Sequence, residues 1–445
     1  MQTIENRQHN TAKPNSDSTS RQRTLAHLVG LIVFSGMLTL PAGIKVIKML
    51  GAFPLHIYDV LFVPAVLLAL KEQVQKPRLG LALLSILPPA FVGLYNSYPA
   101  DVFCRDFFGV LYVVLMVLVA GSLVSWRQVE IVGRYIVACL ALSAFVELLI
   151  TAGVLANPTV LRSSFSGSAS YDSGMGRLIT NVHLLAAVAL STFVGLYLNK
   201  SRSTRMTKLA AISMLVIIAL AGSRLFVIML AVPMVMHLFG SNRTVVAKRL
   251  LYGTSTLVIL LPTVGALGEV VGINVQSLGS YFLNIVARLL TLSSGNLASS
   301  DQSAYYRTYE ISQATVSIRE YPFFGRGFGS SYMPAFFKGD SWLAVNGGSY
   351  VHDSFYWFLV KSGFVGLALW LTWVFNGLRS NGTTSPEFRI SRATVVALLV
   401  ICLVWNASNN TPDVLAFGLA LGITFATRRG LIGTNPLLRT SGPRT

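Results

Sequence analysis

The sequence predicts an all-α, polytopic membrane protein with about 12 transmembrane helices and one large extracytoplasmic loop. The 445 residues are 53% hydrophobic and only 12% charged, whereas a soluble domain carries about twice that charged fraction. Mean hydropathy is +0.62, and apolar runs long enough to cross a bilayer recur along the chain. Because lipid cannot satisfy backbone polar groups, these runs are expected to be helical.

Apolar windows of about 20 residues place the spans in order. The windows are 25–44, 53–70, 79–97, 102–124, 130–155, 178–198, 207–222, 224–240, 250–268, 352–377, 392–408 and 412–427. The pair 207–222 and 224–240 is also compatible with one re-entrant segment.

Lysine and arginine gather in alternate connections between the windows. The positive-inside rule places these connections in the cytoplasm, together with both termini. The polar segment between spans 9 and 10 is then extracytoplasmic, and its length indicates function rather than simple connection. Within it, 281–291 and 302–320 have helical periodicity. The expected organisation is a disordered tail over 1–23, spans 1–9 within 24–268, the loop over 269–351, spans 10–12 within 352–430, and a tail over 431–445.

Charge and cysteine usage exclude several classes of protein. The net charge of +18 is dispersed between apolar segments, so nucleic-acid binding is not expected. Cys104, Cys139 and Cys402 lie in or beside apolar runs without a CxxC, as small buried hydrophobic residues do. No cluster of histidine and cysteine suggests a metal, and no cofactor is expected.

Three of the arginines on the predicted extracytoplasmic side, where positive charge is not favoured, are candidates for anion binding. Arg177 follows Gly176, Arg224 follows Gly222-Ser223, and each opens a predicted span, whose N-terminus would attract an anion. A guanidinium at such a place makes a bidentate anion site, although an interfacial arginine that snorkels is the alternative. Arg307 lies on the predicted loop helix, where a solvated helix face is the alternative.

The loop ends in groups suited to acid–base chemistry. His352 opens a predicted span, and a helix N-terminus favours the neutral imidazole that a general base requires; a structural interfacial histidine is the alternative. Asp353 does not face His352 on a helix, so capping that helix is its expected role. Upstream, Gly325, Gly327 and Gly329 fit either an anion-binding backbone nest or a plain turn. Aromatic residues that could stack on sugars, or form an interfacial belt, include Tyr321, Phe323, Phe324 and Phe328.

These features together resemble the O-antigen ligase/polymerase family. The resemblance rests on Arg307, on Tyr321-Pro322-x-x-Gly325-x-Gly327-x-Gly329, on His352-Asp353 before a glycine-bearing helix, and on the Gly222-Ser223-Arg224 element. One departure is Asp353, where the family pattern has asparagine.

The resemblance implies a metal-independent glycosyltransferase of the bacterial inner membrane. Its donor would be a glycan on undecaprenyl diphosphate, and its acceptor a sugar hydroxyl. His352 would be the general base, Arg177, Arg224 and Arg307 would bind the pyrophosphate, and Tyr321, Pro322, the three loop glycines and Asp353 would belong to a substrate loop. A flippase and a chain-length regulator are candidate partners.

Four functions are compatible with such a chain. The first is a polymerase that joins repeat units of an exopolysaccharide or O-antigen, and the second is a ligase that moves the finished glycan onto a lipid A core. A twelve-span transporter is less favoured, because that fold has similar halves joined by a central cytoplasmic loop. A membrane acyltransferase using His352 is the fourth.

Overall fold

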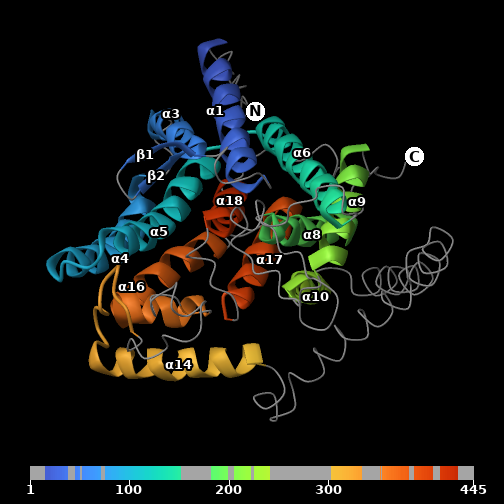
Figure 1. The fold of residues 1–445 in the computed structure, drawn as a ribbon. Helices are drawn as coiled ribbons and strands as arrows, with labels where there is room; N and C mark the ends of the chain where they lie inside the picture. Colours follow the sequence, from blue (N-terminus) through green and yellow to red (C-terminus); the bar gives the residue numbers. More distant parts are fainter. Residues whose placement is uncertain are drawn as a thin grey trace, which may run out of the picture.

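The structure, a computed structural model, is a bundle of helices in which one short hairpin is inserted (Figure 1). It describes residues 16–38, 46–50, 53–71, 76–151, 182–198, 205–221, 225–240, 302–332, 351, 353–379, 385–403 and 411–428. Within these residues the chain forms twelve helices and two antiparallel strands. The all-helical prediction is therefore confirmed for the described part of the chain, apart from the hairpin.

The first half of the chain contributes α1 (Ser16–Met37), β1 (Val46–Leu50), β2 (Phe53–His56), α3 (Ile57–Lys71), α4 (Lys76–Tyr95), α5 (Ala100–Gly121), α6 (Trp126–Thr151), α8 (His183–Leu198), α9 (Arg205–Ala221) and α10 (Leu225–Gly240). The second half contributes α14 (Gln302–Glu320), α16 (Ser354–Leu378), α17 (Pro386–Ile401) and α18 (Thr411–Arg428).

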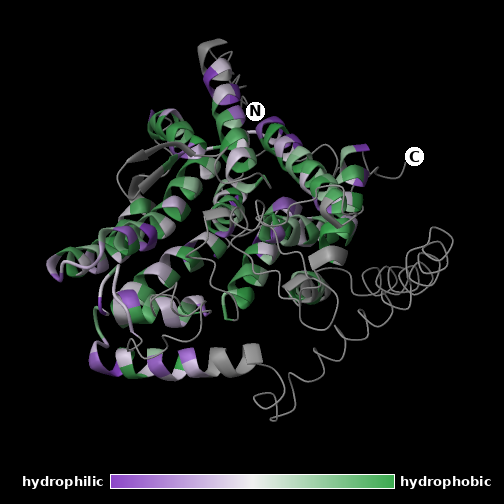
Figure 2. Cartoon of the chain, viewed as in Figure 1, coloured by the Kyte–Doolittle hydropathy of each residue, from purple (hydrophilic) through white to green (hydrophobic). Residues whose placement is uncertain are grey.

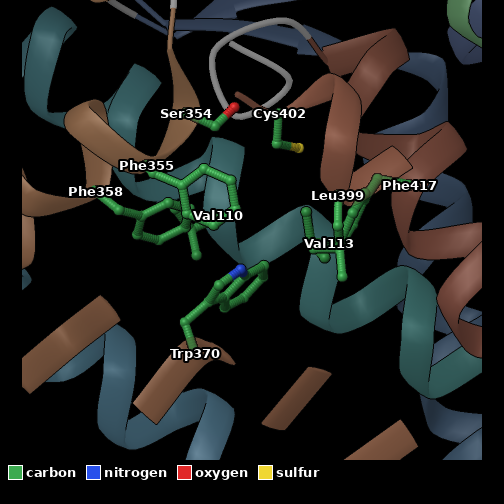
Figure 3. A pocket seen from close by; sticks show the side chains of 9 residues that line it. All are labelled: Val110, Val113, Ser354, Phe355, Phe358, Trp370, Leu399, Cys402 and Phe417. Carbon is green, nitrogen blue, oxygen red and sulfur yellow. The ribbon is translucent and has the colours of Figure 1, made fainter. Parts of the chain in front are cut away.

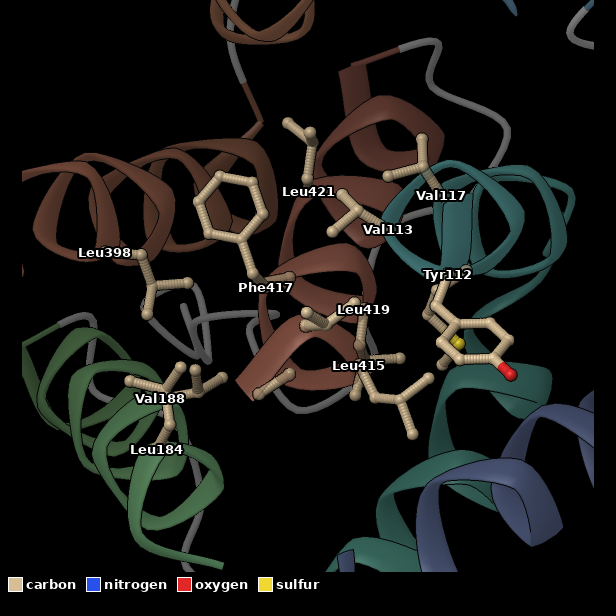
Figure 4. Packing of buried hydrophobic residues seen from close by; sticks show 14 of the residues in the cluster. Tyr112, Val113, Val117, Leu184, Val188, Leu398, Leu415, Phe417, Leu419 and Leu421 are labelled. Atoms are coloured by element: carbon tan, nitrogen blue, oxygen red, sulfur yellow. The ribbon is translucent and has the colours of Figure 1, made fainter. Parts of the chain in front are cut away.

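Helices α5 and α18 form the most closely packed pair, and they lie at the centre of the apolar core (Figure 4). Small residues allow their backbones to approach. A Cβ atom added at Gly422 would lie 2.7 Å from Cβ of Ala120, and one added at Gly418 would lie 2.7 Å from Cβ of Met116. Close packing of small residues is a main source of attraction between helices in lipid, where burial of apolar surface gains nothing.

The other helices surround this pair. α1 packs on α3 and α6, α17 packs on α18, and α8 and α10 pack on α17. α4 lies against both α5 and α16. α14 runs along α16 at the lower edge of Figure 1 and is more hydrophilic than the helices above it (Figure 2).

Length and composition allow three of the described helices to cross a membrane, namely Ala100–Gly121, Trp126–Leu149 and Ser354–Leu378. Two shorter apolar helices cover Leu79–Tyr95 and His183–Leu198. α4 also exposes an apolar face containing Leu83, Leu87, Phe91 and Leu94. An exposed face of this kind suits contact with lipid better than contact with water.

Eleven of the predicted windows coincide with a described helix, while window 250–268 and the predicted helix 281–291 lie outside the described residues. The predicted loop helix 302–320 is confirmed as α14. The start of window 53–70 is wrong, because Phe53–His56 pairs with Val46–Leu50 as a strand and the helix begins at Ile57. A short apolar run does not distinguish a strand from a helix. The number of spans and their sidedness stay predictions.

Candidate functional site

The predicted site residues divide into two groups. Arg177, Arg224 and His352 lie outside the described residues, and Arg307 lies on α14, where only the backbone is described. Their convergence on one cavity therefore stays a prediction. The substrate-loop residues, by contrast, lie in well-defined surroundings between α4, α5 and α16.

Asp353 caps the N-terminus of α16. Its Oδ1 atom accepts hydrogen bonds from the backbone N–H groups of Phe355 and Tyr356, at 2.8 and 3.1 Å. Burial raises the pKa of the Asp353 carboxyl, and these two hydrogen bonds act in the opposite direction. The side chain therefore satisfies two N–H groups that the first turn of a helix otherwise leaves open. The next residue is held as well, since the N–H of Ser354 donates to the carbonyl of Cys402 at 2.9 Å.

Substitution of Asp353 distinguishes capping from chemistry. We expect Asp353→Asn to keep both stability and activity, because an amide oxygen caps a helix about as well as a carboxylate. Asp353→Ala removes the acceptor and should lower the free energy of unfolding by about 1 kcal/mol. Thermal unfolding in detergent measures the stability difference. Loss of activity in Asp353→Asn at unchanged stability would instead assign the carboxylate a chemical role.

Helix α16 is broken at Gly363, whose φ of 63° and ψ of −170° are not helical. The break leaves backbone groups open inside a helix that is long enough to cross the membrane. Residues of the glycine turn, Tyr321–Ser330, satisfy them from both sides. The N–H groups of Arg326 and Gly327 donate to the carbonyls of Val360 and Lys361 at 2.8 and 2.9 Å. On the other side of the break, the N–H groups of Phe364 and Val365 donate to the carbonyls of Pro322 and Phe323, at 2.8 and 3.1 Å. Irregular backbone at membrane depth is tolerated where protein completes it in this way.

The amides of the glycine turn point into the protein. Beyond those of Arg326 and Gly327, the N–H of Phe328 donates to the carbonyl of Pro89 at 2.9 Å, and that of Gly329 donates to Oδ2 of Asp106 at 2.9 Å. Because these amides are bonded to protein groups, the segment is a plain turn, the second of its two predicted alternatives, rather than an anion-binding nest.

Glycine is required in this turn for two reasons. Gly325, Gly327 and Gly329 all have φ between 68° and 88°, a region that residues with a Cβ atom rarely adopt. Close backbone approach is the second reason: a Cβ atom on Gly327 would lie 2.5 Å from the amide nitrogen of Gly93 in α4. The repeated glycines therefore press the turn against α4 and α16.

A buried ion pair joins the turn to two helices. Nζ of Lys361 in α16 lies 2.7 Å from Oδ2 of Asp106 in α5, and both side chains are completely buried. The same Nζ donates to the carbonyl of Ser330 at 2.5 Å. Neither charged residue was singled out from the sequence. The available signal was a charge inside each of two apolar windows, since ionisable residues in spans are rare and mark functional regions by default.

The aromatic residues of the turn separate into two kinds. Phe328 is buried and stacks on Trp357 with ring centroids 6.1 Å apart, so its predicted candidacy for stacking on sugars is wrong. Tyr321, Phe323 and Phe324 are exposed. Tyr321 also receives the guanidinium of Arg326 over its ring at 5.0 Å. Of the four aromatic residues of the glycine turn, only these three exposed rings can meet a substrate.

An apolar cavity lies beside the first turn of α16 (Figure 3). Ser354 and Cys402 lie at one end of it and Trp370 at the other. Its remaining lining residues are Val110, Val113, Phe355, Phe358, Leu399 and Phe417. The cavity therefore lies between α5, α16, α17 and α18, next to the capped start of α16.

The fold and these contacts define a helical membrane protein with a broken helix completed by a glycine turn. Residues 177–371 match the family model of O-antigen ligases. This match confirms the resemblance to the O-antigen ligase/polymerase family that the sequence predicts. A search of curated proteins found no match. The match supports a membrane enzyme of the ligase or polymerase type, which acts on lipid-linked glycans. The matched segment contains the glycine turn and most of α16, including Lys361.

Proposed function

We propose that the protein polymerises oligosaccharide repeat units carried on undecaprenyl diphosphate, at the extracytoplasmic face of the bacterial inner membrane. The observation that carries this proposal is the family match over residues 177–371, which includes all four residues assigned to the reaction. The product would be an exopolysaccharide or an O-antigen. The predicted topology, with both termini in the cytoplasm, supports the assignment to that face.

The proposed mechanism needs only side chains. His352 takes the proton of the acceptor hydroxyl as that oxygen forms the new glycosidic bond. The bond from the donor sugar to the lipid diphosphate breaks, and the electron pair goes to the diphosphate. Arg177, Arg224 and Arg307 would stabilise the charge that develops there. Because these cations replace the role of a metal ion, transfer should continue undiminished in EDTA.

Three features of the described part of the chain suit this chemistry. Asp353 fixes the start of α16 directly after His352 in the sequence. The apolar cavity beside that start suits the hydrocarbon near the lipid end of the donor. The exposed rings of Tyr321, Phe323 and Phe324 are available to sugars.

Removal of the proposed pyrophosphate-binding arginines should weaken transfer. We expect Arg177→Ala and Arg224→Ala each to lower kcat/KM for a lipid-diphosphate donor by roughly 10²- to 10³-fold, as loss of one preorganised donor does elsewhere. The lysine variants should retain part of the activity, because charge survives but bidentate geometry does not. Arg319→Ala is the matched control, since Arg319 is an exposed arginine on α14. Wild-type rates in both alanine variants would remove these two arginines from the pyrophosphate site.

A deletion strain tests the polymerase assignment against the ligase alternative. If the protein is a polymerase, the strain should carry single repeat units without chain extension. If it transfers finished glycan to a lipid A core, long chains should instead remain on the carrier lipid. The purified protein acting on a defined lipid-linked repeat unit then tests the reaction directly, and absence of any transfer would overturn the proposed function.

A further inference from the structure

Three separate segments meet at the carboxylate of Asp106. Its Oδ2 atom receives the ammonium of Lys361 from α16 at 2.7 Å and the N–H of Gly329 from the glycine turn at 2.9 Å. Its Oδ1 atom lies 3.4 Å from the guanidinium of the adjacent Arg105. Nζ of Lys361 also donates to the carbonyl of Ser330 in the turn, so that Asp106, Lys361 and the turn each contact the other two. The side chains of Asp106, Lys361 and Ser330 are fully buried.

Stability alone explains this arrangement poorly. Removing two charges from water is costly, and well-packed apolar residues of similar size often stabilise a protein as much as a buried ion pair does. Apolar contacts are not directional, however, whereas the ammonium and the carboxylate here fix particular atoms of three segments relative to one another. The pair therefore specifies an arrangement that apolar packing would leave loose.

The element held by this arrangement is the first half of α16. The break at Gly363 separates residues 354–362 from the rest of the helix, so the continuous backbone does not by itself fix their direction. Lys361 lies near the broken end, about 10 Å along the axis from Ser354. Asp353 caps the opposite end. A small rotation about Gly363 would therefore displace the start of the half-helix.

We propose that Asp106 and Lys361 are positioning residues that lock the half-helix 354–362 against the glycine turn and so hold the start of α16 in its working place. This inference rests on the proposed function, because His352 precedes Asp353 in the chain and is the base of that reaction. Neither side chain takes part in the chemistry. They affect glycan transfer only because they set the position of α16.

The test is a double variant, Asp106→Asn with Lys361→Met. Either change alone leaves one buried charge uncompensated, so both single variants should accumulate poorly. The double variant removes both charges and should keep a thermal midpoint close to that of the wild type. It nevertheless loses the bond from Nζ to the carbonyl of Ser330. We expect kcat to fall about 10- to 100-fold while KM stays within about twofold, as a displaced catalytic group predicts.

The matched control is Ser191→Ala with Thr394→Val. This pair forms a buried hydrogen bond of 3.0 Å between α8 and α17, and its loss should leave kcat unchanged. A double variant of Asp106 and Lys361 that is stable and has wild-type kcat would overturn the proposal. Lys361→Arg with native Asp106 keeps a cation at this place and should therefore retain a larger part of kcat than the double variant.

Hydrogen exchange gives a second measurement that does not depend on glycan transfer. In the double variant, the amides of Arg326, Gly327, Phe364 and Val365 should exchange at least about tenfold faster than in the wild type, because the turn and the half-helix separate more often. Amides of α18 should not change. If the wild-type protein transfers no glycan, the proposed function fails, but hydrogen exchange still tests whether Asp106 and Lys361 hold the half-helix against the turn. Unchanged exchange at the four amides would overturn that positioning role.

Discussion

His352→Ala is expected to reduce glycan transfer by roughly 10²- to 10⁴-fold, the range that a general base contributes. The protein should fold normally, because the cap of α16 is supplied by Asp353 and not by its neighbour. His352→Gln should be as inactive as the alanine variant, since an amide can accept a hydrogen bond but cannot take up the proton. Single-turnover assays with a lipid-linked repeat unit measure the loss.

The pH dependence of the wild-type enzyme provides a second measurement of the same role. A protonated imidazole cannot accept a proton, so kcat/KM should fall as the pH falls through the pKa of His352. This acid limb should disappear from the residual activity of His352→Ala. His27→Ala is the control, because His27 is an exposed histidine on α1 whose ring contacts the hydroxyl of Tyr135. A fully active His352→Ala would remove the general base from the mechanism.

Apolar windows predicted the helices well, because a membrane-spanning helix requires a long run of apolar residues. They failed at Phe53–His56, where a few apolar residues form a strand, and the windows contained no information on that pairing. They also missed the break in α16. Gly363 is one glycine in an apolar run, and only its backbone conformation, with φ of 63° and ψ of −170°, shows that the helix is interrupted there.

The sequence predicted those features of the candidate site that depend on one residue and its neighbours in the chain. Asp353 was expected to cap a helix from its place before an apolar run, and the hydrogen bonds confirm this. The Asp106–Lys361 pair joins residues 255 positions apart in the sequence (361 − 106), so spacing could not reveal it. The hydrogen-bond partners of the glycine turn are equally non-local, which is why a nest and a plain turn could not be separated from the sequence.

Replacement of Gly363 by alanine should have the largest effect on stability. The backbone at Gly363 has φ of 63° with ψ of −170°, a combination that is essentially restricted to glycine. A Cβ atom there would also lie 2.6 Å from the amide nitrogen of Phe324. Backbone strain and overpacking together should lower the free energy of unfolding by about 2–6 kcal/mol.

The matched control for Gly363→Ala is Gly133→Ala. Gly133 lies inside α6, and a Cβ atom added to it meets nothing within 4 Å. Alanine should therefore be neutral or should stabilise the protein by roughly 0.5–1 kcal/mol, because it loses less backbone entropy on folding. Thermal unfolding of both variants in the same detergent measures the difference, whose sign should reverse between the two sites. Equal stability of Gly363→Ala and the wild type would mean that α16 is continuous, and the half-helix that Asp106 and Lys361 are proposed to hold would then not exist as a separate element.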